Sequence, residues 1–291
     1  MTAFAVAPQE IATGFIGACE AELNAPKPGN VHVFADGHGM TAADFLASAE
    51  AAAPFIAASS ATVGARIAGA VEATWARVGQ NTNLGIILLC APLAQAAATA
   101  QSGDLRRETQ RVLQALDVDD ASAAFRAIAM ARPAGLGDAP QHDVHAPART
   151  TLLEAMRAAA DRDRIAWQYA NGFADIFGLG LGMLAKARAR GADAALATLL
   201  VYSALLAAFA DSHIARKHGL AAAESIREEA ALFETHLESA ESRQASFELA
   251  LQFDRALKRR GLNPGTSADL TVAVLFADYL AAILARPRKN G

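Results

Sequence analysis

The residues of this sequence that could do chemistry lie in five short polar segments, each containing glycine. The segments are 25–40 (APKPGNVHVFADGHGM), 79–85 (GQNTNLG), 132–147 (RPAGLGDAPQHDVHAP), 211–219 (DSHIARKHG) and 261–270 (GLNPGTSADL). Each places small and polar residues next to an expected helix N-terminus. Such termini present unpaired backbone amides and the positive end of the helix dipole, which favour anions. The pattern therefore predicts a site for a phosphate-bearing ligand.

The first segment holds a lysine on a stiff turn. Pro28 biases Lys27 toward an extended conformation, and Gly29 allows a ligand to approach the backbone closely. A compact ammonium group held in this way suits a phosphate contact. A rigid turn with a solvated lysine fits the same residues, since Pro-Gly turns are common. Both interpretations stay open on this segment alone.

Two aspartates stand next to apolar helical sequence. Asp211 follows the apolar run Ala194–Ala210, and Asp269 is expected in the first turn of the last helix. Carboxylates in such places can hold Mg²⁺ or accept a proton. Equally, Asp211 can pair with Arg216 or Lys217, and a first-turn aspartate often does no more than complement the helix N-terminus.

The histidines do not have the spacing of a zinc site. His142 and His145 lie in a predicted loop without a third spaced ligand, while His213 and His218 are out of register for one helix face. Segment 132–147 is long for a connection within a compact domain and is typical of a lid or binding loop. The sequence contains no Walker loop, dinucleotide-binding glycine motif or nucleophile elbow.

The elements that must position these segments are helices. Of the 291 residues, 53% are hydrophobic and only 6% aromatic, so alanine, leucine, isoleucine and valine dominate. Strong helix formers with few β-branched runs predict an all-α protein. The sequence contains no internal repeat or low-complexity linker. We therefore expect one helical domain over residues 1–291, a bundle whose polar loops converge on a central cleft.

The expected helices can be placed by their caps and periodicity. Pro8 suits a first helical turn, and Thr41 suits an N-cap with Asp44 reaching back to it. A charged stretch, 221–260, predicts one or two solvent-facing helices. The other expected helices cover about 8–24, 41–59, 64–78, 104–116, 119–131, the region from 149 to 210, and the C-terminal end after 266.

Composition also excludes some functions and predicts an environment. The net charge of −4 without a basic block argues against nucleic-acid binding. The apolar run Ala194–Ala210 is shorter than the roughly 20 residues of a membrane span, so we expect a core helix and no membrane. Cys19 and Cys90 lie in apolar patterns and are expected to be buried, reduced thiols. With no export signal recognised, the expected location is the cytoplasm. The alanine-rich faces leave room for a homodimer.

Five stretches in chain order resemble motifs of the triphosphoribosyl-dephospho-CoA synthase family, helical enzymes of citrate lyase and malonate decarboxylase prosthetic-group synthesis. PKPGNV is similar to PKPGLVD, and GHGMTAADFLASA to GxHxDM followed by an F…S helix. GQNTNLGIILL is similar to GGVNTHKGAIF, DSHIARKHG to a D-(S/T)-N segment ending in Gly-Gly, and LNPGTSADL to LSPGGSADL. The resemblance covers nearly the whole chain.

The departures from these motifs fall on polar positions. Asn83 and Leu84 replace the histidine and lysine of NTHKG, and His32 replaces the aspartate of GLVD. His213 replaces an asparagine, and Gly39 stands where the family has an aspartate. These changes predict a divergent branch with an altered substrate or metal arrangement.

The resemblance implies a transferase that moves the 5-triphosphoribosyl group of ATP to the 2′-hydroxyl of 3′-dephospho-CoA and releases adenine, with Mg²⁺ accompanying ATP. In this scheme Asp211 and Asp269 hold Mg²⁺ or act as base, and Glu72 is a further candidate acid. Lys27, the amides around Gly29, and Ser267 contact phosphate. The remaining substrate-binding candidates are Asn30, His38, Asn81, Thr82, Asn83, Ser212, His213 and Gly265.

Two other hypotheses stay open at this point. In the first, the fold and the nucleotide-dependent transfer are the same, but the acceptor is another cofactor precursor such as a pterin, a furan or a different phosphorylated intermediate. In the second, the chain is a non-catalytic helical nucleotide-binding or scaffold protein.

Overall fold

The computed structural model describes residues 4–133, 144 and 146–286. The prediction of an all-α protein is confirmed, because these residues form fourteen α-helices and one π-helical segment. The helices are α1 Pro8–Leu23, α2 Ala42–Ile56, α3 Val63–Val78, α4 Leu84–Ala98, α5 Leu105–Gln114, α6 Val118–Ala131, α7 Leu152–Ala159, α8 Arg164–Ala170, η1 Ile176–Gly180, α9 Leu181–Ala189, α10 Ala194–Ala208, α11 Ser212–His218, α12 Leu220–Glu238, α13 Arg243–Arg259 and α14 Gly265–Leu284.

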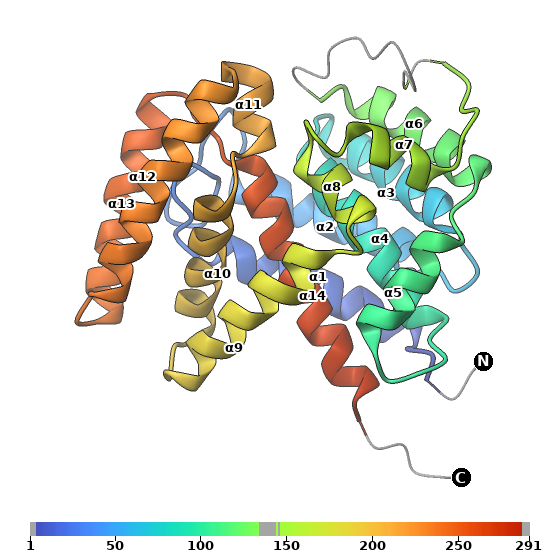
Figure 1. Cartoon of the computed structure of the whole chain (residues 1–291), viewed down its shortest axis with the longest axis horizontal. Coiled ribbons are helices and arrows are strands. Elements are labelled where there is room, and N and C mark those ends of the chain that lie inside the picture. The colour runs from blue at the N-terminus through green and yellow to red at the C-terminus, as the bar shows by residue number, and fades with distance from the viewer. Residues whose placement is uncertain (1–3, 134–143, 145, 287–291) are drawn as a thin grey trace.

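The last helix is the centre of the fold. In Figure 1, α14 (red) passes between a group made of α9, α10, α12 and α13 and a second group that contains α3 to α8. It packs against α1, α4 and α10, and most of its side chains are buried. By length and apolar composition α14 could cross a membrane, but 67% of its most apolar window is buried inside the protein, as in a core helix.

The local signals place several helix ends correctly. Pro8 opens α1, and Thr41 caps α2 in a capping box with Asp44. Gly79 ends α3 with φ 68°, a left-handed conformation that glycine adopts without strain. The charged stretch 221–260 forms two helices, within the prediction of one or two. Cys19 and Cys90 are buried thiols, and burial raises the pKa of both.

Two expectations about the polar segments are wrong, and a third concerns residues that the structure does not describe. Segment 211–219 is mostly the short helix α11, because Asp211 caps it by accepting from the backbone N–H of His213 and Ile214. Asp269 is not in the first turn of α14, since that helix begins at Gly265. In segment 132–147, residues 134–143 and 145, with both predicted loop histidines, lie outside the described residues.

Candidate active site

A cavity of about 480 Å³ opens where all five polar segments meet. This volume is typical of a small-molecule site. The prediction that polar loops converge on a cleft is therefore confirmed. The predicted site residues that line the cavity are Asn30, His38, Asn81, Thr82, His213, Gly265 and Asp269.

Asp269 is the predicted catalytic carboxylate that reaches this cavity. No described residue forms a hydrogen bond with the carboxyl group of Asp269. Burial, together with the negative charges of Asp211 and Glu22, raises the pKa of Asp269 well above its ordinary value. A carboxyl group in such a setting exchanges protons nearer neutral pH than an exposed aspartate does, which suits acid–base work.

Gly85 makes the space that the Asp269 carboxyl group occupies. A Cβ at position 85 would lie 1.9 Å from Asp269 Oδ2 and 2.8 Å from Ile165 Cδ1. We expect Gly85→Ala to push the carboxyl group aside and lower kcat/KM about 100-fold, the scale of a misplacement of about 1 Å. Steady-state kinetics with a melting curve would check this.

A matched control for that variant is Gly17→Ala. Gly17 is also helical, but a Cβ there would meet nothing within 4 Å. Alanine should leave activity unchanged and stabilise the helix by about 0.5–1 kcal/mol. Normal turnover by Gly85→Ala would show that the position of the Asp269 carboxyl group is not critical.

The carboxylate of Asp211, unlike that of Asp269, is fully hydrogen-bonded, because it accepts from four donors. Oδ1 accepts from the backbone N–H of His213 and Ile214, at 2.9 and 3.2 Å. Oδ2 accepts from the backbone N–H and the hydroxyl of Ser267, at 2.8 and 2.9 Å. The aspartate is buried and does not line the cavity. Its predicted role as a metal ligand or base is therefore corrected: Asp211 ties the N-termini of α11 and α14 together.

We expect Asp211→Asn to lower the stability of the folded protein and not to act directly on the chemistry. The amide nitrogen of asparagine cannot accept from Ser267, so at least one buried N–H loses its partner, at a cost of about 1–3 kcal/mol. Asp193→Asn is the matched control, because Asp193 also caps a helix but is exposed. Asparagine caps as well as aspartate there. Equal denaturation midpoints for the two variants would contradict this assignment.

Lys27 fits neither interpretation of its segment, the phosphate contact or the solvated lysine on a rigid turn. Its side chain is fully buried, and Nζ contacts Glu22 Oε1 at 2.5 Å, Val31 O at 2.6 Å and Asn30 Oδ1 at 3.2 Å. All three ammonium protons are thus used, and Lys27 does not line the cavity. The residue is neither solvated nor free to contact phosphate. It holds Glu22 and Asn30, which do line the cavity.

The other predicted residues lie outside the cavity wall. Gly29 has φ 80°, and a Cβ there would lie 2.7 Å from Pro264 Cδ, so the glycine allows two loops to pack closely. Glu72 is exposed on α3, which removes it from the site. Asn83, Ser212 and Ser267 are buried behind the wall.

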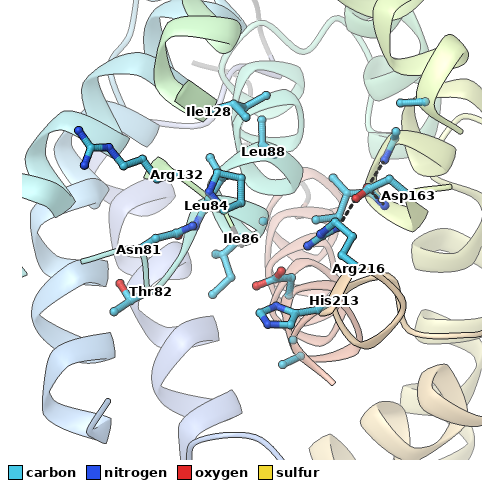
Figure 2. Close-up of a pocket in the computed structure, with 18 of the residues that line it drawn as sticks. Asn81, Thr82, Leu84, Ile86, Leu88, Ile128, Arg132, Asp163, His213 and Arg216 are labelled. Carbon is cyan, nitrogen blue, oxygen red and sulfur yellow. Dashed lines mark hydrogen bonds and ion pairs between the residues drawn. The ribbon is translucent and has the colours of Figure 1, made fainter. Parts of the chain in front are cut away.

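Four cationic side chains of the wall were not predicted as site residues: Arg132, Arg162, Arg216 and Lys217. In Figure 2, Arg132 lies on the side of Asn81, and Arg216 lies opposite with Asp163. Arg216 pairs with Asp163 at 2.5 Å, yet its buried Nε has no partner among the described residues. Arg216 and Lys217 are neighbours in segment 211–219, whereas Arg132 and Arg162 come from other parts of the chain, so no single motif contains all four.

His213 supplies a neutral polar group on the same helix as Arg216. Burial, assisted by the charges of Arg216 and Lys217, lowers the pKa of His213 to about 3. Its buried Nε2 is also without a partner among the described residues. Another part of the wall is apolar, with Leu84, Ile86 and Ile128 among its residues (Figure 2). Together the wall can hold anions at its cations and a flat ring against its apolar part.

Comparisons with known proteins identify the family of this chain. The model of the CitG family, described as ATP:dephospho-CoA triphosphoribosyl transferase, matches residues 8–287. A crystal structure from Archaeoglobus fulgidus, of a protein with the provisional name triphosphoribosyl-dephospho-CoA synthase, is 26% identical with a TM-score of 0.61, covering 82% of this chain and 99% of that one. No curated protein matches. Because the family model spans nearly the whole chain, this protein belongs to the ATP:dephospho-CoA triphosphoribosyl transferase family.

Proposed function

We propose that the cavity binds ATP beside a phosphorylated acceptor of the dephospho-CoA kind and transfers the 5-triphosphoribosyl group to an acceptor hydroxyl. The observation that carries this proposal is the composition of one cavity. Its wall combines the four cations with two carboxyl groups, the buried Glu22 and the half-buried Asp269, and an apolar surface.

The wall suits the parts of the donor nucleotide. Guanidinium and ammonium groups bind phosphate oxygens through charge-assisted hydrogen bonds, so the triphosphate belongs near Arg162, Arg216 and Lys217. Arg216 Nε, a buried donor without a partner among the described residues, would gain one from a phosphate bound beside it. Adenine fits the apolar wall, where its departure is not opposed by charge.

The transfer is a displacement at the anomeric carbon. The bond from C1′ to adenine breaks, a bond from C1′ to the acceptor oxygen forms, the hydroxyl gives up its proton and the departing adenine takes one. Positive charge develops on the ribose ring during this step. Asp269 would receive the hydroxyl proton, and Glu22 would stabilise the developing charge through space. Both groups must be held in line with the ribose, and their positions on the packed helices α1 and α14 would support this.

The donor set also indicates how Mg²⁺ would be held. Among the described residues no group of three histidine, cysteine, aspartate or glutamate side chains could bind a metal. Mg²⁺ is commonly held by one or two carboxylates, nucleotide phosphates and water; because Asp269 is assigned as the base, the phosphates and water would hold the ion here. When bound, the ion would neutralise phosphate charge. Asp211 does not fit this role, because its oxygens are occupied.

The test is incubation of the purified protein with ATP, Mg²⁺ and 3′-dephospho-CoA. Chromatography should show adenine, and mass spectrometry should show dephospho-CoA carrying one added triphosphoribosyl group. Adenine release that requires some other acceptor would select the hypothesis of a different cofactor precursor. Absence of adenine with every phosphorylated acceptor, despite ATP binding, would support the non-catalytic one.

One observation favours a different acceptor. Leu84 lines the cavity at the position where the resembled motif has lysine. An apolar side chain there leaves the wall with one cation fewer, so an acceptor with fewer phosphate groups than dephospho-CoA would fit this region better. Leu84→Lys is a direct probe, because it should favour dephospho-CoA if that is the lost contact.

A further inference from the structure

A chain of buried hydrogen bonds leads from Lys27 to the cavity. Lys27 Nζ donates to Asn30 Oδ1 at 3.2 Å, and Asn30 Nδ2 donates to Asn263 Oδ1 at 2.8 Å. Asn30 and Asn263 are 5% and 6% exposed, and both line the cavity. The chain therefore joins a buried charge to a side chain that a ligand can reach.

The order of donors in this chain is fixed by chemistry. An ammonium group only donates, so the oxygen of Asn30 must face Lys27 and its NH₂ group must face Asn263. Asn263 then has to present its oxygen to Asn30. Its own NH₂ group is left pointing elsewhere, and no described residue accepts from it. Asn263 thus offers the cavity a donor and not an acceptor.

The surroundings of Asn263 indicate which ligand group this donor meets. Asp269, six residues further along the chain in α14, lines the same cavity, and Glu22 shares Lys27 with Asn30. Two carboxyl groups disfavour a phosphate in this corner. A ribose suits it, because one hydroxyl can donate to a carboxylate and its oxygen can accept from an amide.

We propose that Asn263 donates a hydrogen bond to a ribose hydroxyl of the nucleotide and thereby selects ribose over deoxyribose. This rests on the proposed function, in which that ribose carries the reacting carbon. The amide side chains of Asn30 and Asn263 also depart from the resembled family motifs. In the motifs PKPGLVD and LSPGGSADL, the corresponding positions hold leucine and serine, so both members of the pair differ together.

The test measures dissociation constants for ATP, 2′-deoxy-ATP and 3′-deoxy-ATP by calorimetry. The unaltered protein should bind one deoxynucleotide about three- to tenfold more weakly than ATP, the value of one hydrogen bond. In Asn263→Ala this ratio should fall toward one, because only the hydrogen bond from the hydroxyl to the carboxylate remains. An unchanged ratio in that variant would overturn the proposal.

The variant Asn30→Asp tests the orientation without touching Asn263. Aspartate still accepts from Lys27 but cannot donate, so Asn263 must turn and present its oxygen to the cavity. The ribose hydroxyl has a single proton, which can then go to the carboxylate or to Asn263 but not to both, so the ratio should fall toward one. In the Asn263→Ala background, Asn30→Asp should change it no further. A normal ratio in Asn30→Asp would refute the orienting chain. If melting curves show that Asn30→Asp does not fold, Asn30→Leu, the motif residue, replaces it.

Adenine release by the unaltered protein is measured in parallel. Adenine release together with an unchanged ratio in Asn263→Ala refutes this inference alone. Failure of the unaltered protein to bind any of the three nucleotides refutes the proposed function, and the inference with it.

Discussion

Asp269→Asn is expected to abolish transfer while leaving the protein at least as stable as before. Loss of the group that takes the hydroxyl proton should lower kcat about 10²–10⁴-fold. Asparagine has nearly the same shape and fits the space above Gly85. Nucleotide binding should therefore persist, which separates a catalytic effect from a collapse of the cavity.

The stability expectation follows from the raised pKa of Asp269. Between its ordinary pKa, about 3.9, and its raised value, the folded state binds more protons than the unfolded state. Stability contributed by this group is therefore fully present at low pH and declines as pH rises through that window. Asparagine does not titrate, so the variant should gain stability over the unaltered protein as pH rises. Urea titrations at several pH values would measure this difference.

The same pKa predicts the acid side of the activity profile. A base works only when deprotonated, so kcat/KM should rise with pH through a value above that of an ordinary aspartate. Asp278→Asn, on the exposed part of α14 where Asp278 pairs with Arg188, is the matched control and should retain activity. Full activity of Asp269→Asn, or a stability that falls below that of Asp278→Asn, would contradict the role given to Asp269.

Sequence reasoning succeeded where the deciding contacts are local. Pro8, the Thr41–Asp44 capping box and Gly79 act within one helical turn, so their helix ends could be predicted. The order of polar segments also predicted a shared cavity. Segment 211–219 was misjudged because its polar composition hid a short helix whose cap, Asp211, also binds the start of α14.

The individual roles could not be predicted because they depend on distant partners. Asp211 and Asp269 look alike in sequence. Yet Ser267, 56 residues from Asp211, donates to the carboxylate of Asp211 and not to that of Asp269. Arg132 and Arg162 carry no motif, and only the packing of helices brings them to one cavity. The sequence was enough to predict that the polar segments converge. The role of each charged residue could be assigned only from the tertiary structure.

Lys27→Met should have the largest effect on stability of any single change considered. It leaves Glu22 as a buried carboxylate without its cation, and breaking a buried pair from one side costs about 3–5 kcal/mol. Burial already lowers the pKa of Lys27 and raises that of Glu22, which shows that the pair is held against a desolvation cost. Chemical denaturation would measure the loss.

A double variant distinguishes the pair from other causes. Glu22→Gln in the Lys27→Met background removes the uncompensated charge and should recover at least half of the lost stability. Lys186→Met, which breaks the exposed pair with Glu238, should cost no more than about 1 kcal/mol. If Lys27→Met instead keeps its stability and loses nucleotide binding, the lysine contacts phosphate after all. The buried position of Nζ, with three acceptors around it, is the reason to expect the opposite.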